Sequence, residues 1–484
     1  MPNKHNHSSY TIAVELLVSA ISGDKLEQSS LYQHAADYFK NAVANKKKLA
    51  QLNAEIRGVT LALQTQDGKN IQVLEQRLEY LNKDYKIEHL SQESARTRRL
   101  NAAIKVCLEI LSLSEGENFE ETQLKSAKFL TTLVLFSPEK GKKLAELHDC
   151  LKPAYKAVLG LRLLDKLVSD GVMKNAYILK NYDAQKRYEH SETNYECYTQ
   201  AVIMPIMLAA IFQDIGLQNP ELEELLEGKD RDKDRFRLLE SPEREEILAL
   251  NYQHTMDYFK NGLGCQQAGA KASSDIANFD EADQKRLKFQ LSLVLDSKSS
   301  KLGTSEIIKI PQIYASIILS TKRDYQRRYL PVASKLISQL AVKKVLSPKV
   351  SDIFISIVGQ FPLGFGIAYI AQDENGYDLN SYEYAIVTEL NPPKPEQAIC
   401  RLVTRSLMFL PHGKTEIIKK NQNLHFEFVR KKLVKIDSKR LAEIMRKLSH
   451  NYDLEDSKPI IPHYWEPYTY FCIQGNQKLW SEDG

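Results

Sequence analysis

The first half of the chain alternates apolar and polar positions with the period of an α-helix. Apolar residues recur at spacings of three, four and six between residues 31 and 63, with charged and amide residues between them. The same spacing starts again at Ile71, after a turn-forming Gln-Asp-Gly-Lys stretch. Because residues three and four apart share one face of a helix, this pattern predicts a long helical hairpin.

Helical periodicity also covers residues 11–22, 100–113, 122–136 and 144–168, so we expect residues 1–185 to form an all-helical region. The seam of the hairpin has heptad-like spacing. Such a seam usually packs within one chain, and the alternative is a homodimer through this N-terminal region. His34, His89 and His148 stand alone on polar stretches. We predict solvated or capping side chains for these three histidines.

The most apolar run of the chain covers residues 201–212 and ends abruptly in a Gln-Asp-Ile-Gly sequence that contains Asp214. Such a helix end places the carboxylate where the core meets solvent, a position from which a protein holds a metal ion or caps a helix. Asn219 and Pro220 predict the start of another helix. His254 lies on the next long helical segment.

Beyond residue 361 the apolar period changes from that of a helix to that of a strand. Short alternating runs are separated by turn-forming Asn, Gly and Pro residues, which indicates half-buried strands. The aromatic tail at residues 463–471 is too apolar to stay in water and is expected to fold back on the body. The predicted strands are residues 365–370, 382–387, 398–403, 416–418 and 425–429, and the predicted final helix is residues 438–448.

Composition indicates a globular protein, and 484 residues suffice for two or three domains. With 66 Lys and Arg against 62 Asp and Glu residues, the net charge of +4 makes nucleic acid an unfavoured partner. The six Cys residues contain no C-x-x-C pair, so we expect neither zinc ribbon nor disulfide framework, and a cytoplasmic location. The longest apolar run, 12 residues, is too short to cross a membrane.

The apolar helix that ends in Asp-Ile-Gly, followed after a spacer by a His-bearing helix, resembles the HD superfamily of metal-dependent phosphohydrolases. Residues 310–315, 323–325 and 350–364 follow in an order similar to that of HD-GYP domains, the bacterial phosphodiesterases that open cyclic di-GMP. The resemblance implies a mainly α protein with three regions. These are a helical regulatory or interaction region (1–185), an HD-like α-helical core (186–360) and a small basic antiparallel β module with a terminal helix (361–484).

The resemblance implies a metal site at Asp214, His254 and His190, but most of the family's ligands are missing. Its His-Asp pair reads Gln213-Asp214 here, and no histidine lies between His254 and His412. The family's chemistry needs two or three cations held together to generate a hydroxide. We therefore predict a catalytically silent protein with no cofactor. The alternative is an active phosphodiesterase with an atypical site that binds iron, manganese or zinc.

Function is then expected to rest on binding, as in a bacterial signalling or scaffold component. The resemblance suggests a cyclic dinucleotide as the ligand, and a protein partner is the alternative. Arginine can grip phosphate oxygens in pairs while stacking on a purine. The candidate ligand-binding residues are Arg323, Arg327 and Arg328 in the core, and Arg401 and Arg405 in the β module.

Overall fold

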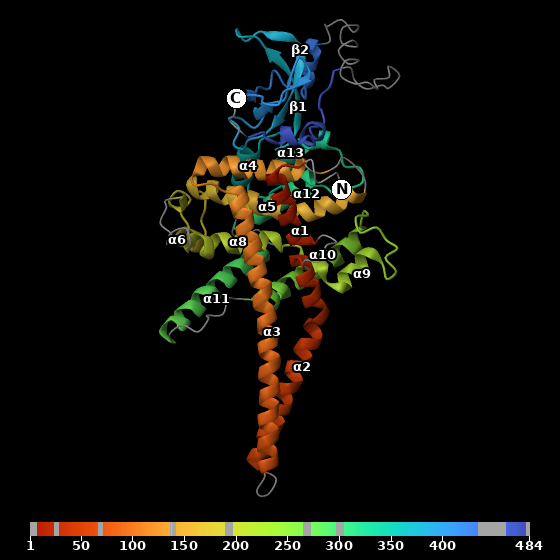
Figure 1. Cartoon of the computed structure of the whole chain (residues 1–484). Coiled ribbons are helices and arrows are strands. Elements are labelled where there is room, and N and C mark those ends of the chain that lie inside the picture. The colour runs from red at the N-terminus through yellow and green to blue at the C-terminus, as the bar shows by residue number, and fades with distance from the viewer. Residues whose placement is uncertain are drawn as a thin grey trace. The chain divides into compact units, whose positions relative to one another are not determined.

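The computed structural model describes residues 7–23, 29–65, 71–135, 137, 142–188, 197–264, 273–296, 304–433 and 461–480. Helices dominate the chain, and a small antiparallel sheet lies near its C-terminus (Figure 1), which confirms the predicted mainly α class with a β module. In the described part of the chain, no helix is both long and apolar enough to span a bilayer.

The chain divides into two compact units that are assembled from segments distant in sequence. Unit 1 comprises Met1–Val18, Leu108–Ala210 and Leu295–Gly484, and unit 2 comprises Ser19–Cys107 and Ile211–Val294. The three regions predicted from the sequence, 1–185, 186–360 and 361–484, are consecutive along the chain, whereas these units are defined by spatial contacts. The three regions stay a prediction.

Unit 2 contains the helical hairpin that the sequence predicts. Its arms are α2 (Leu31–Thr65) and the part of α3 (Ile71–Ser114) up to residue 107, and they run antiparallel in Figure 1. An ion pair between Lys48 and Glu88 joins the two arms. No side chain of α3 from residue 71 to residue 95 is fully buried, because a two-helix seam covers only one stripe of each helix.

The other elements of unit 2 follow the hairpin in sequence. Asn219 caps α9 by accepting a hydrogen bond from the backbone N–H of Glu221, and Pro220 lies in the first turn, as predicted. Leu222 and Leu226 pack with Ile247 of α10 in a small core. These elements are the 3-10 helix η4 (Ile215–Gln218), α9 (Pro220–Glu227), α10 (Ser241–Asp257), the π-helix η5 (Tyr258–Leu263) and α11 (Ser273–Asp296).

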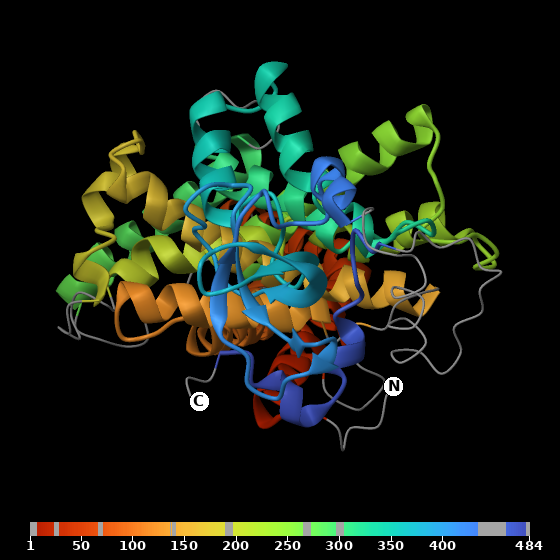
Figure 2. The ribbon, with the colours of Figure 1, turned by 90° about the horizontal axis from the view of Figure 1, so that it is seen from above.

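Unit 1 has a helical part built around α5, which packs against α12 and α14. A Cβ atom on Gly160 would lie 3.0 Å from the carbonyl oxygen of Ile307, so glycine at this position favours the close approach of α5 and α12. Helices α13 and α14 lie side by side (Figure 2). The helices of this part are α1 (Ser9–Ser22), α4 (Phe119–Leu135), α5 (Lys142–Ser169), α6 (Ala176–Asn181), η2 (Lys186–Tyr188), η3 (Thr199–Ile203), α8 (Met204–Ile211), α12 (Glu306–Ile318), η6 (Arg327–Tyr329), α13 (Val332–Val342) and α14 (Pro348–Val358).

The β module of unit 1 contains a four-stranded antiparallel sheet with the order β1-β2-β3-β6 and a separate β4-β5 pair. Tyr369 pairs with Glu383 across β1 and β2, and Cys400 pairs with Glu416 across β3 and β6. Ile370 lies in the core of the module. The strands are β1 (Gly366–Gln372), β2 (Asp378–Val387), β3 (Ala398–Leu402), β4 (Thr404–Arg405), β5 (Met408–Phe409) and β6 (Thr415–Ile418).

The strand predicted at residues 425–429 is wrong, because this segment leads into the helix α15 (Glu427–Leu433). Val429 and Leu433 are both buried, and their spacing of four residues is that of a helix face. The guanidinium of Arg430 also donates hydrogen bonds to the carbonyl oxygens of Leu424 and His425, which fixes the turn before the helix.

The C-terminal tail folds back on the body, as predicted. Trp465 stacks on Tyr384 of β2 with ring centroids 5.0 Å apart, and its indole N–H donates a hydrogen bond to the carbonyl oxygen of Ala385. The tail continues into α17 (Tyr468–Phe471) and η7 (Gln474–Gln477). The predicted helix at residues 438–448 lies outside the described residues.

Candidate functional site

The predicted metal ligands have different hydrogen-bond partners. Asp214 accepts a hydrogen bond from the side-chain amide of Asn251 at 3.5 Å, and its side chain does not cap η4. The ring of His254 lies 3.2 Å from the side-chain amide of Asn219 and 3.3 Å from the carboxylate of Glu221. His190, the third predicted ligand, lies outside the described residues. Among the residues that the structure describes, no three His, Cys, Asp or Glu side chains are grouped to hold a metal ion.

The glycine of the Asp-Ile-Gly sequence has a packing role. A Cβ atom on Gly216 would lie only 2.3 Å from the carbonyl oxygen of Asn251, so η4 and α10 can approach this closely only at a glycine. The backbone N–H of Gly216 also donates a hydrogen bond to the hydroxyl of Thr255 at 3.0 Å. The sequence feature that resembles an HD site therefore has a structural explanation within unit 2.

The three core arginines predicted as ligand contacts have different environments. Arg327 is buried, and its guanidinium donates hydrogen bonds to Glu466 and to the carbonyl oxygens of Val134 and Ser137. Arg323 and Arg328 are exposed. Arg327 thus anchors the tail, and only its neighbours present their side chains to solvent.

Arg401 and Arg405 of the β module lie on β3 and β4. Arg401 is half-buried and donates a hydrogen bond to the hydroxyl of Thr415 at 3.3 Å. Arg405 is exposed and begins a turn in which Ser406 and Leu407 both have positive φ angles.

A polar cavity of about 660 Å³ lies in unit 2 between α2, α3 and η5. This volume is typical of sites for small molecules, which usually occupy 300 to about 1,000 Å³. Four Lys or Arg side chains and two acidic ones line it, together with two histidines and several amides. The lining residues used below are His34, Asp37, Tyr38, Asn45, Lys46, His89, Glu93, Arg96, Arg98, Arg99 and Asn261.

One wall of the cavity is held in place by Asp257, the last residue of α10. Its carboxylate accepts hydrogen bonds from the hydroxyl of Tyr38 at 2.7 Å, and from Lys46 and Asn261 at 2.8 Å each. The pKa of Asp257 is lowered because these hydrogen bonds outweigh the effect of burial, which by itself raises it. Lys46 is therefore neutralised and serves to join α2 to α10.

The π-helix η5 turns its last carbonyl groups toward α3. Arg96 donates a hydrogen bond to the carbonyl oxygen of Leu263 at 2.9 Å, and Arg99 donates one to that of Gly262 at 2.8 Å. Gly264 has a φ of +61°, and a Cβ atom there would lie 2.6 Å from the guanidinium of Arg96. The positive φ angle favours glycine at position 264, and π-helices often occur near functional sites.

Two arginines of the cavity lining, Arg98 and Arg99, lie near His34. Arg98 and Arg99 both lie close enough to His34 to lower its pKa, although burial is the larger cause and Asp37 opposes the shift. Arg99 is half-buried beside the ring of Tyr38, and burial lowers the pKa of its guanidinium. Within the described residues, neither arginine forms an ion pair with a carboxylate. A bound anion could therefore pair with either guanidinium group.

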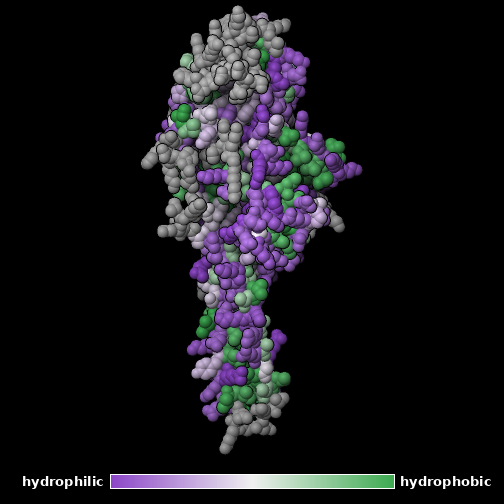
Figure 3. All heavy atoms as spheres, turned by 90° about the vertical axis from the view of Figure 1, so that its right-hand side faces the viewer, coloured by the Kyte–Doolittle hydropathy of each residue, from purple (hydrophilic) through white to green (hydrophobic). Residues whose placement is uncertain are grey.

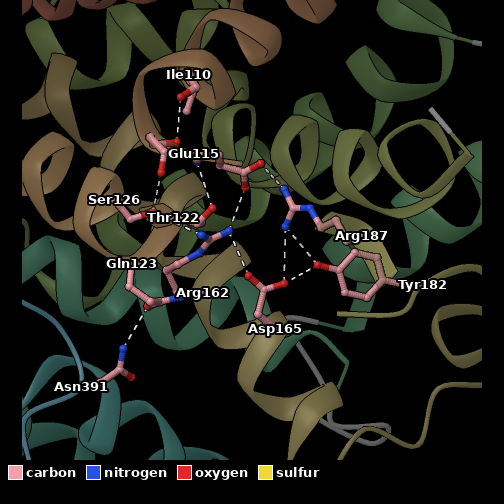
Figure 4. Close-up of polar contacts among 12 residues, drawn as sticks. Ile110, Glu115, Thr122, Gln123, Ser126, Arg162, Asp165, Tyr182, Arg187 and Asn391 are labelled. Carbon is pink, nitrogen blue, oxygen red and sulfur yellow. Dashed lines mark hydrogen bonds and ion pairs between the residues drawn. The ribbon is translucent and has the colours of Figure 1, made fainter. Parts of the chain in front are cut away.

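A second polar cluster lies fully inside unit 1 (Figure 4). Arg162 forms ion pairs with Glu115 at 2.8 Å and with Asp165 at 3.0 Å, and Arg187 pairs with the same two acids. The hydroxyl of Tyr182 donates a hydrogen bond to Asp165. Burial lowers the pKa of Arg162, but Asp165 and Glu115 raise it further, so the net shift is upward. Two cations and two acids balance, which indicates a structural role.

The cavity residues had no predicted binding role. His34 is half-buried in the cavity and is not simply solvated, and His148 is buried, so the prediction of a solvated or capping side chain is wrong for His148. The sequence feature that could have indicated the cavity is the adjacent pair Arg98 and Arg99 on a predicted helix, since its predicted partner helix carries His34. Only the antiparallel register of α2 and α3 brings these side chains to one place.

No model of a known protein family, no curated protein and no solved structure matches this chain.

Proposed function

We propose that this chain is a catalytically silent, HD-GYP-like bacterial signalling protein that acts by binding and not by hydrolysis. The observation that supports the proposal is the hydrogen bonding at the HD-like positions. Asp214 is bonded to an amide of α10, whereas His254 contacts Asn219 and Glu221 of the α9 cap. Amide partners suit a packed helix junction, whereas catalytic metals need imidazole and carboxylate ligands that converge on one point.

The test is elemental analysis of the full chain purified without chelator, combined with a phosphodiesterase assay in added Mn²⁺ and Fe²⁺. We expect metal well below one ion per chain and no hydrolysis of cyclic di-GMP. Stoichiometric metal and activity that are both lost in Asp214→Ala and His254→Ala would refute the proposal. The matched control is Asp230→Ala, which removes an exposed carboxylate from the same unit.

Partner binding through the hairpin, the second form of this proposal, is favoured by apolar side chains on the outer face of α3. Val73, Tyr80 and Ile87 are spaced by seven residues and are 64%, 69% and 57% exposed. Figure 3 shows hydrophobic patches within an otherwise hydrophilic hairpin surface. A heptad spacing keeps such residues on one stripe, which is the arrangement of helices that pair with another helix. The partner we propose is a second copy of this chain.

A further inference from the structure

We infer that the cavity between α2, α3 and η5 binds a nucleotide through its phosphate groups. This inference rests on the proposed function, since a ligand that is bound and not hydrolysed needs a site away from the HD-like positions. The volume of about 660 Å³ accommodates a nucleotide or a cyclic dinucleotide. The site lies within unit 2 and involves none of the arginines that the sequence suggested.

The carboxylates of the described residues do not pair with every cation of the cavity, and Asp37, the lining carboxylate that forms no ion pair among these residues, accepts a hydrogen bond from Gln33 at 3.0 Å. Lys46 is paired with Asp257, and Arg96 is paired with Glu93 at 2.8 Å. Arg99, which forms no ion pair with a carboxylate among the described residues, donates a hydrogen bond to the carbonyl oxygen of Gly262 and lies beside the ring of Tyr38. A guanidinium that is partly removed from water without an acidic partner gains most from an anion, because burial has already removed part of its hydration.

Phosphate is the anion that fits this arrangement best. Arg98 and Arg99 are neighbours on α3, and together they offer planar donor groups that can hold phosphate oxygens in pairs. His34 adds an imidazole whose Nε2 lies 3.2 Å from the hydroxyl of Ser29. Its lowered pKa keeps the ring neutral near pH 7, and a bound phosphate opposes that shift by stabilising the imidazolium.

The remainder of the cavity can recognise a nucleobase. The side-chain amide of Asn45 has no hydrogen-bond partner among the described residues, so both its N–H donors and its oxygen acceptor are available to the edge of a base. His89 of α3 also lines the cavity and stacks on Tyr85 with ring centroids 5.9 Å apart. An exposed imidazole on a ring stack can be extended by one more aromatic ring, which a purine supplies.

Calorimetric titration of the full chain tests the inference with three probes: cyclic di-GMP, ATP and inorganic pyrophosphate. We expect a nucleotide to bind more tightly than pyrophosphate. Arg98→Gln and Arg99→Gln should each raise the dissociation constant about ten- to a hundredfold, the effect of one lost charged hydrogen bond. Arg77→Gln, an exposed arginine on α3 outside the cavity, is the matched control and should leave the constant unchanged.

Absence of heat at millimolar nucleotide, or equal dissociation constants for the wild type and the Arg98→Gln/Arg99→Gln variant, would overturn the inference. Pyrophosphate that binds as tightly as every nucleotide would overturn the nucleotide assignment. Because Arg98 is exposed, its replacement tests the site without a risk to folding. Chromatography of the titrated ligand separates the two proposals: a hydrolysed nucleotide refutes the silent function, whereas an intact but unbound one refutes only this site.

Discussion

Removal of Arg187 from the buried cluster of unit 1 should destabilise the protein strongly. The side chain is inaccessible to solvent and neutralises Glu115 and Asp165, and it also donates a hydrogen bond to the hydroxyl of Tyr182 at 3.1 Å. Arg187→Met keeps the length and removes the charge, which leaves one excess negative charge in a buried site. Breaking a buried ion pair in this way costs about 3–5 kcal/mol.

The assay is thermal unfolding followed by circular dichroism. For a cooperative unit of about 300 residues, the size of unit 1, an unfolding entropy of about 2.1 cal/mol/K per residue converts that loss into a Tm decrease of roughly 5–8 °C. Lys186→Met is the matched control, because its side chain is 59% exposed and should change Tm by less than about 1 °C. A Tm for Arg187→Met equal to that of the control would refute the reasoning.

Three further predictions concern single side chains. Burial lowers the pKa of His148 to about 3, so the imidazole is neutral in the native state at neutral pH. Its contribution to stability is complete above pH 6.5, and the free energy of unfolding decreases below that pH by up to about 1.4 kcal/mol per pH unit. Urea titrations at several pH values should show this slope for the wild type and not for His148→Asn. Glu383→Ala should cost about 1–3 kcal/mol in urea unfolding, because its carboxylate accepts hydrogen bonds from Thr404 and from the backbone N–H of Leu407; a loss below 0.5 kcal/mol, on the order expected for a surface change, contradicts it. Tyr80→Glu should make a dimer monomeric by light scattering, and a wild-type chain that is monomeric at all concentrations excludes the proposed pairing.

The helices could be predicted because each carries its own apolar period. The seam from Leu31 to Thr65 and the cap at Asn219 are local patterns, and the structure reproduces both. The segment at residues 425–429 shows the limit of such patterns, since alternation over five residues fits a strand as well as the start of a helix. There, tertiary contacts of Val429 and Leu433 decide the outcome.

The candidate site could not be predicted, because its residues come from three elements whose relation is set by tertiary structure. Asp257 and Tyr38 are distant in sequence, yet their hydrogen bond fixes one wall of the cavity. Arg327 shows the same dependence on tertiary structure, because this arginine, predicted from sequence as a ligand contact, donates hydrogen bonds to Glu466 and to two backbone carbonyls. A charged residue whose hydrogen-bonding groups are already occupied by the protein has fewer groups left to contact a ligand.

The same unit thus contains a sequence feature that resembles a catalytic site and a cavity that has the charge of a binding site. Gly216 is required by the packing of η4 on α10, and Gly264 is favoured by its positive φ angle. If the HD-like positions are structural, Asp214→Ala should lower Tm and leave nucleotide affinity unchanged. Arg98→Gln should leave Tm unchanged and lower nucleotide affinity. Stability and affinity then separate along the chain, because the first depends on groups with protein partners and the second on groups without them. If Arg98→Gln lowers both Tm and nucleotide affinity, the cavity is part of the packing and not a binding site.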